Sequence, residues 1–224
     1  MTGPTELLLI RHAQAWCNVE DIVGGPLGCR GLTPVGWEQA ERLAARLAAE
    51  EHADVLYASP RRRARETAVA AGHALGLPVR IEEGLREQDL GSADGVPRYQ
   101  LHQGLGVIPA HLPHRPLADG AESWTAFVER TGQALRELTR RHRGERVLAV
   151  CHGETVNAAH HFFLDLPMGW PGPLGVTVDN ASLTRWREQP WDQYQPELGL
   201  RWDLQTHNDT AHLVQNGTLP CASS

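Results

Sequence analysis

Two histidines stand where a short aliphatic run gives way to polar residues. His12 follows the run Leu-Leu-Leu-Ile with Arg11 beside it, and His152 follows the run Val-Leu-Ala-Val-Cys. A neutral imidazole can attack phosphorus when neighbouring cations lower its pKa, and the fixed fork of donors on arginine matches phosphate oxygens. These residues therefore predict a phosphate pocket in which a phosphohistidine forms.

Arg63 and Glu87 come after two further short runs of apolar residues. A carboxylic acid near the phosphate can protonate the leaving oxygen and afterwards take a proton from the attacking water, which is the role we expect for Glu87. Taken singly, a histidine or glutamate at a strand end is more often structural or exposed. About three of four neighbouring arginines are expected, on spacing alone, to lie on a solvated helix face: Arg61, Arg62, Arg63 and Arg65. The convergence of several such residues at one edge favours the functional interpretation.

Short aliphatic runs alternate with longer stretches of helical period, and this alternation predicts how the polar residues meet. The expected strands are 7–10, 55–57, 79–81 and 146–150, with edge strands at 182–186 and 198–202. Helices are expected to start at Thr33, at Ser59 with Pro60, and at Ser123, and a fourth covers 155–164. The pattern predicts a three-layer α/β/α sandwich with a mostly parallel central sheet. Ligands bind beyond the carboxyl ends of parallel strands, which is where the polar residues are expected.

The 224 residues are expected to form a single domain over 1–213. Residues 91–120 are rich in glycine, proline and histidine without a sustained period, so they predict an irregular insertion over one end of the sheet. The polar residues 214–224 predict a flexible tail.

Composition excludes several classes of protein and site. A formal net charge of -6 does not suit a chain that binds nucleic acid. Neither a long apolar run nor a secretion signal is present, so we expect a soluble cytoplasmic protein with no membrane partner. The four cysteines form no CxxC pair, and no structural zinc, other metal or cofactor is expected. The expected partner is a small phosphate ester, and a homodimer is left open.

Five segments resemble, in the same order, the motifs of the histidine phosphatase superfamily, also called phosphoglycerate mutase-like proteins. The segment LIRHAQAWCN is similar to the first motif, with Arg11, His12 and Asn18 at matching positions. The other four similar segments are LTPVGWEQAERL, YASPRRRARETA, LREQDLGSADG and VLAVCHGETVNA. Together the five segments span about two thirds of the chain. Three residues depart from the family pattern near the expected pocket: Ala13, Ala15 and Glu154.

The resemblance implies the phosphatase branch of this family and a phosphoglycerate mutase-like fold. It implies that His12 is the nucleophile, that Glu87 is the proton donor, and that His152 is the second catalytic histidine of the pocket. The phosphate-binding residues that it implies are Arg11, Asn18, Arg63 and Gly153. The expected function is a metal-independent phosphatase that hydrolyses a small phosphomonoester through a phosphohistidine. A phosphoglycerate-type mutase and a catalytically silent protein that binds phosphate esters stay open as alternatives.

Overall fold

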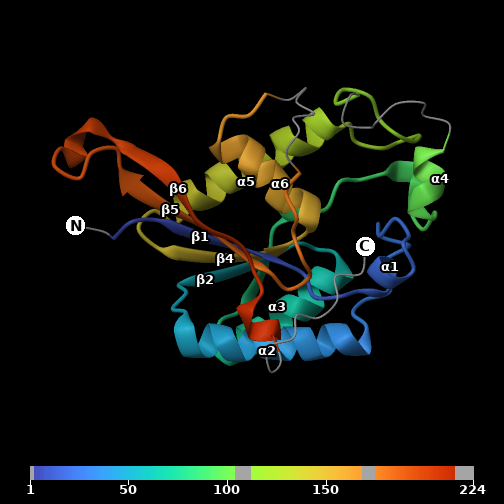
Figure 1. The fold of residues 1–224 in the computed structure, drawn as a ribbon, viewed down its shortest axis with the longest axis horizontal. Helices are drawn as coiled ribbons and strands as arrows, with labels where there is room; N and C mark the ends of the chain where they lie inside the picture. Colours follow the sequence, from blue (N-terminus) through green and yellow to red (C-terminus); the bar gives the residue numbers. More distant parts are fainter. Residues whose placement is uncertain (1–2, 104–111, 168–174, 215–224) are drawn as a thin grey trace.

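A computed structural model describes residues 3–103, 112–167 and 175–214 of the chain (Figure 1). Within those residues, six strands form one sheet in the order β3-β2-β4-β1-β5-β6. The strands are β1 (Glu6–Arg11), β2 (Val55–Ala58), β3 (Val79–Ile81), β4 (Arg146–Cys151), β5 (Leu183–Pro190) and β6 (Leu200–Asp209). The strands β1 to β4 are parallel to one another, whereas β5 is antiparallel to β1 and β6 is antiparallel to β5. The predicted mostly parallel sheet is therefore confirmed.

Helices cover both faces of the sheet, which gives the predicted three layers (Figure 1). The lower face in this view carries α2 (Pro34–Glu50) and α3 (Arg62–Leu75), and the upper face carries α5 (Trp124–Arg141) and α6 (Gly153–Phe163). The shorter helices and turns are α1 (Trp16–Val19), η1 (Glu83–Leu85), η2 (Gly91–Ala93), α4 (Arg98–His102), η4 (Pro196–Leu198) and η5 (Ala211–Leu213). No helix in the described ranges has the length and apolar character to cross a membrane.

The two apolar cores explain why β1 is a continuous aliphatic run. Leu8 and Ile10 pack into the core that includes Leu43 of α2, whereas Leu7 and Leu9 pack into the opposite core with Leu135 and Trp186. A central strand that is buried on both faces needs apolar residues at successive positions. Arg11 and His12 therefore mark the place where the chain leaves the sheet.

Two of the predicted helix starts are confirmed, and one is wrong. The hydroxyl groups of Thr33 and Ser123 accept backbone N–H groups in the first turns of α2 and α5. Ser59 does not start α3, which begins three residues later, at Arg62. The hydroxyl of Ser59 is hydrogen-bonded to His152 instead. The helix predicted at 155–164 begins earlier, at Gly153.

The second half of the chain differs more from expectation. β5 reaches Pro190, and β6 covers Leu200–Asp209 instead of 198–202, so the two strands form a long hairpin that extends beyond the body of the sheet (Figure 1). The insertion predicted at 91–120 contains η2 and α4, and its residues 104–111 lie outside the described part of the chain. Residues 215–224 of the predicted tail also lie outside it.

Candidate active site

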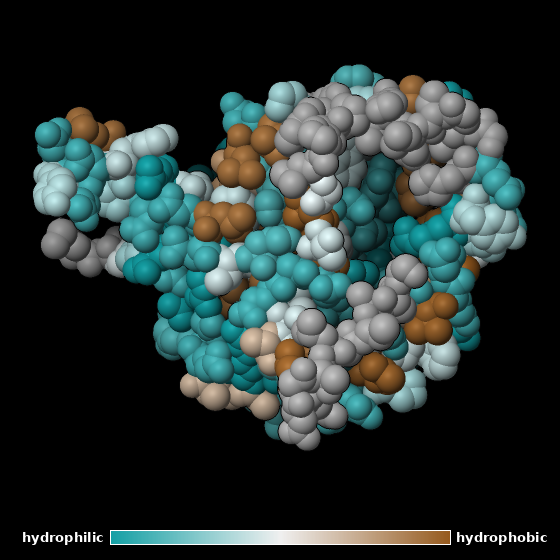
Figure 2. Space-filling model, in the orientation of Figure 1, coloured by the Kyte–Doolittle hydropathy of each residue, from teal (hydrophilic) through white to brown (hydrophobic). Residues whose placement is uncertain are grey.

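The carboxyl ends of β1 and β4 bring the two histidines together. Arg11 and Cys151 are paired at the ends of the adjacent parallel strands β1 and β4. His12 and His152 directly follow these two residues, so they lie side by side. Their ring centroids lie 5.2 Å apart in an edge-to-face arrangement, and both rings are buried. Figure 2 shows a hollow with hydrophilic walls on the side of the molecule where these strands end.

The hydrogen bonds of His12 fix its tautomer. Its Nδ1 lies 2.8 Å from the carbonyl oxygen of Ala13, which can only accept, so Nδ1 carries the proton. The Nε of Arg63 can only donate, and it lies 2.9 Å from the Nε2 of His12. Burial and the charges of Arg63 and Arg11 hold the pKa of His12 well below its ordinary value. The ring is therefore neutral at pH 7 and presents a lone pair at Nε2.

His152 sits beside this lone pair in a similar environment. Its Nε2 lies 2.7 Å from the hydroxyl oxygen of Ser59. Its Nδ1 is buried, and among the described residues it has no hydrogen-bond partner. Burial, the charge of Arg63 and the ring of His12 hold the pKa of His152 well below its ordinary value. An anion placed between the histidines would favour a proton on His152 and so gain a donor.

Two arginines supply the positive charge of the site. Arg63 is buried on the first turn of α3 and donates from Nη1 to the carbonyl oxygen of Gly24 over 2.6 Å. Arg11 donates from Nη1 to the carbonyl oxygen of Val178, and its Nε is buried without a partner in the described residues. Guanidinium N–H groups that face a buried pocket are suited to phosphate oxygens.

The prediction that three of the four clustered arginines would be solvated is wrong. Arg62 and Arg65 are exposed, but Arg61 is as buried as a core residue and forms an ion pair with Asp89 over 3.8 Å. The charge of Arg61 also contributes to the low pKa of His152. The error follows from the helix start, because α3 begins at Arg62 and leaves Arg61 in the extended connection.

Glu87 is partly buried in the segment that follows η1. Burial raises its pKa above the ordinary value, and the nearby carboxylate of Glu154 raises it further, against the opposing charge of Arg63. Its Oε1 accepts the backbone N–H of Gln88 over 3.1 Å. The protonated form of Glu87 therefore persists to higher pH than that of an exposed glutamate, which suits a proton donor.

Arg130 of α5 supports the segment that carries Glu87, and sequence reasoning missed it. Its guanidinium donates to the carbonyl oxygens of Gly84 over 2.9 Å and Arg86 over 3.3 Å. Glu122 holds the same guanidinium and also accepts the backbone N–H of Asp89. This ion pair ties α5 to the backbone on both sides of Glu87.

Asn18 and Gly153 lie at the edge of the site. The Oδ1 of Asn18 accepts the backbone N–H of Ala15 over 2.9 Å, and Asn180 donates to the same oxygen over 3.4 Å. Asn18 thus shapes the loop after β1. Gly153 begins α6, and the Nε of Arg11 lies 3.7 Å from the position that a Cβ on this glycine would occupy. Backbone N–H groups at this helix start face the same region as Arg11.

Asp94 closes the loop beside Arg63 and was not singled out from the sequence. Its carboxylate accepts the backbone N–H groups of Gly25 over 2.8 Å, Leu27 over 2.6 Å and Gly28 over 2.9 Å. The loop so held carries the Gly24 carbonyl that positions Arg63. The Asp-Gly pair at the end of the motif LREQDLGSADG is the signal that marks this clamp.

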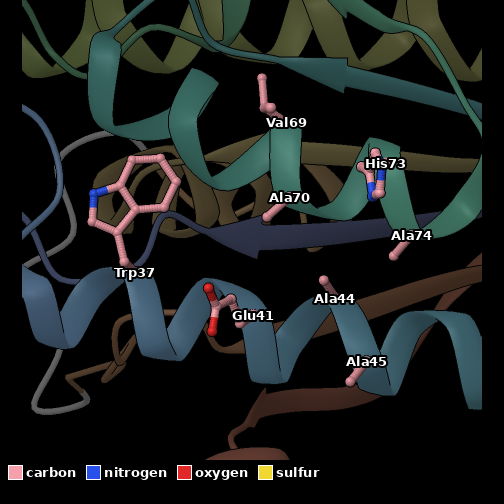
Figure 3. A pocket seen from close by; sticks show the side chains of 8 residues that line it. All are labelled: Trp37, Glu41, Ala44, Ala45, Val69, Ala70, His73 and Ala74. Atoms are coloured by element: carbon pink, nitrogen blue, oxygen red, sulfur yellow. The ribbon is translucent and has the colours of Figure 1, made fainter.

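Within the described residues, no cluster of three or more histidine, cysteine, aspartate or glutamate side chains could hold a metal ion. A shallow apolar groove between α2 and α3 is lined by Trp37, Glu41, Ala44, Ala45, Val69, Ala70, His73 and Ala74 (Figure 3). None of the predicted site residues lines this groove.

Sequence comparisons relate the chain to phosphate-handling enzymes. Residues 7–198 match the model of a family described as the histidine phosphatase superfamily (branch 1). Over 221 residues the chain is 29% identical to a protein of Arabidopsis thaliana named metal-independent phosphoserine phosphatase, with 96% of this chain and 86% of the relative covered. Over 178 residues it is 30% identical to a Thermoplasma acidophilum protein named 2,3-bisphosphoglycerate-dependent phosphoglycerate mutase, with 79% and 84% covered.

The fold is similar to that of a solved phosphatase. The native structure of mycobacterial glucosyl-3-phosphoglycerate phosphatase matches with a TM-score of 0.77 and 27% identity, covering 92% of this chain and 100% of that chain. Its complex with VO3 matches with the same TM-score of 0.77.

Proposed function

Because the chain belongs to the histidine phosphatase superfamily and, like the phosphatases it resembles, is a phosphomonoester hydrolase, we propose that His12 is its nucleophile and that a phosphohistidine is its intermediate. The observation that carries this proposal is the tautomer of His12, which keeps the proton on Nδ1 and the lone pair on Nε2. A buried neutral imidazole in a cationic pocket is the form that can attack phosphorus.

In the first step, the Nε2 of His12 forms a bond to phosphorus as the bond from phosphorus to the ester oxygen breaks. The leaving oxygen takes the proton of Glu87, whose raised pKa keeps that proton available. The N–H groups of Arg11 and Arg63 and a protonated His152 stabilise the charge on the transferring group. Arg63 releases the Nε2 of His12 in this step, and the freed N–H can bond a phosphate oxygen.

In the second step, water attacks the phosphorus of the phosphohistidine. The carboxylate of Glu87 takes a proton from this water, and the bond between phosphorus and Nε2 breaks to return neutral His12 and inorganic phosphate. Glu87 and His12 are then back in their starting protonation states, and the net change is hydrolysis of the ester to an alcohol and inorganic phosphate. The residues invoked need no metal ion to complete the cycle.

For the substrate, we propose a small phosphomonoester that also carries a carboxylate. The relatives named above are called phosphatases of phosphoserine and of glucosyl-3-phosphoglycerate, and both compounds have such a group. Arg98 of α4 is the candidate cation for that carboxylate: its side chain is half exposed, it pairs with the exposed Asp21 over 3.7 Å, and its charge lowers the pKa of His12 and of Glu87. Arg98→Gln should therefore raise KM for phosphoserine about tenfold and leave KM for phenyl phosphate unchanged.

The proposal is tested by rapid quench during turnover with labelled phosphate ester. Acid-labile, base-stable label is expected on His12, and the label should be lost in His12→Asn. Inorganic phosphate should accumulate without a bisphosphate primer, activity should survive EDTA, and vanadate should inhibit. Label on another residue would overturn the mechanism, and isomerisation of a monophosphoglycerate without phosphate release would establish the mutase. Binding of esters without any turnover would favour the silent binding protein.

Three expectations from the sequence stay predictions: the single domain over 1–213, the cytoplasmic location, and the absence of nucleic-acid and membrane partners. The net charge of -6 and the lack of a long apolar run support the last two of these. The homodimer stays open.

A further inference from the structure

The outer strand of the sheet, β6, presents a long open edge. It is 10 residues long and is the last strand in the sheet order, so β5 is its one partner among the described strands. The hairpin that it forms with β5 extends away from the helical layers (Figure 1). At the other end of the sheet, β3 has 3 residues. A short edge strand resists pairing with other chains, whereas a long exposed one invites it.

The backbone groups that face outward can be assigned from the ladder. Glu188 of β5 donates its N–H to the carbonyl oxygen of Thr5, on the side away from β6. Trp202 lies directly opposite Glu188, so in an antiparallel pair its own N–H and C=O point away from β5. Leu200 lies opposite Pro190, which has no N–H to share. Leu200, Trp202 and Leu204 therefore offer backbone donors and acceptors to a further strand.

The sequence of this edge is complementary to itself. An antiparallel copy with its twofold axis at Trp202 sets Trp202 against the same residue of the second copy, and Leu200 against Leu204. On the other face of the sheet, the same register sets Arg201 against Asp203, twice. Within one chain these two residues already form an ion pair over 2.9 Å, which shows that the charges are compatible in this strand. Moving the twofold axis by one residue, to Asp203, would set Asp203 against itself.

Apolar side chains lie exposed along the same edge and at the hairpin tip. Leu200 and Leu204 are 51% and 38% exposed, and at the tip Trp191 and Leu198 are 62% and 64% exposed. Figure 2 shows hydrophobic residues at the end of this projecting arm. Exposed apolar side chains that gather on one strand edge and at one hairpin tip favour an interaction site there.

We propose that two copies of this chain associate through β6, in antiparallel register centred on Trp202, so that their sheets join into one. A second copy is favoured over a foreign strand because the charge pattern matches itself and the twofold closes the assembly. Once both β6 edges are covered, the short β3 strands are the remaining edges. The interface is independent of the chemistry at the carboxyl ends of the strands.

Charge reversal tests the register. Wild-type protein should sediment as a dimer, whereas Arg201→Asp and Asp203→Arg should each sediment as monomers, because each variant sets like charges opposite one another. An equimolar mixture of the two variants should restore a dimer that contains one chain of each, since every reversed residue then meets its opposite. Arg143→Asp, an exposed change outside the hairpin, is the matched control and should leave the dimer intact.

Circular dichroism and turnover of a phosphate ester establish that each variant is folded. A monomeric wild-type protein at about 100 μM, a dimer that survives both reversals, or a mixture that stays monomeric would each overturn the proposal. Loss of the dimer in Arg143→Asp as well would also overturn it, because the effect would then follow net charge and not register.

Discussion

The Nε of Arg63 donates a hydrogen bond to the Nε2 of His12 over 2.9 Å, so the arginine occupies the atom of the histidine at which phosphorus would bond. The same guanidinium is anchored through Nη1 to the carbonyl of Gly24, in the loop that Asp94 holds. This arrangement does two things in advance of the reaction. It selects the tautomer of His12 with a lone pair on Nε2. It also places the Nε–H of Arg63 beside the position that a phosphate oxygen would occupy.

Arg63→Lys should test this relationship, because lysine keeps the charge but cannot hold both Gly24 and His12 with a planar fork. We expect kcat/KM to fall about 100- to 1000-fold, as for the loss of one donor to a transition-state anion. The measurement is steady-state hydrolysis of a small phosphate ester. Arg65→Lys, an exposed change on the same helix, is the control and should keep wild-type activity. Equal losses in both variants would point to damage of α3 instead.

Glu87→Gln should separate the proton donor from the rest of the site. An alkyl phosphate needs its leaving oxygen protonated, whereas p-nitrophenol leaves readily without a proton, so kcat should fall about 100-fold or more for the first and far less for the second. The pKa of Glu87 is raised, so the acid form persists to higher pH and alkyl phosphate turnover falls as pH rises through that pKa. Equal losses for the two ester classes would assign the proton to another residue.

Glu154 is a residue that departs from the family pattern, and its carboxylate raises the pKa of Glu87. Glu154→Gln removes this negative charge, so the pKa of Glu87 should fall and its acid form should be lost at lower pH. We therefore expect the alkaline limb of the pH-rate profile for an alkyl phosphate to shift to lower pH. Glu38→Gln on α2 is the charge-matched control. An unchanged limb in Glu154→Gln would mean that solvent screens the pair.

Gly36→Ala should destabilise the fold beside the site. A Cβ at Gly36 would lie 1.9 Å from the carbonyl oxygen of Gln14, so the first turn of α2 or the loop after His12 must move. We expect a loss of about 1–3 kcal/mol in the free energy of unfolding, as in other overpacked sites. Urea unfolding measures it. Gly3→Ala is the control, because the nearest atom to its added Cβ would be 3.9 Å away.

The sequence predicted the central strands well because their physical signal is local. The run from Leu7 to Ile10 is apolar at every position since both faces of β1 are buried, and the same holds for β4. Parallel strands share one carboxyl edge, so their polar end residues had to meet. The proximity of His12 and His152 was therefore predictable without coordinates.

The residues that the sequence missed act through non-local contacts. Arg61 was placed on a solvated helix face because Ser59 with Pro60 resembles a helix start, yet the Ser59 hydroxyl is bonded to His152 instead. Asp94 and Arg130 bind backbone groups from distant segments, so even where a motif includes the residue, as for Asp94, the partners of these bonds cannot be predicted from it. The bounds of β6 were wrong because an exposed edge strand carries no continuous apolar run, and its register depends on the partner strand.

A final prediction concerns stability at low pH, where His212 of η5 docks against α2. Its Nδ1 lies 3.3 Å from Nη1 of Arg46, which donates, and burial together with that charge lowers the pKa of His212 to about 4, against the opposing carboxylates of Asp209 and Glu50. The unfolded chain binds this proton more tightly than the folded chain, since its pKa is about 6.5. This histidine therefore does not change the free energy of unfolding above about pH 6.5, and it lowers that free energy as pH falls from about 6.5 toward 4.

Between pH 7.5 and pH 5, His212→Asn should lose less free energy of unfolding than wild type, as measured by urea titration at each pH. The exposed change His73→Gln on α3 should retain the wild-type loss. An equal loss in wild type and His212→Asn would show that the buried histidines of the active site carry the acid sensitivity instead.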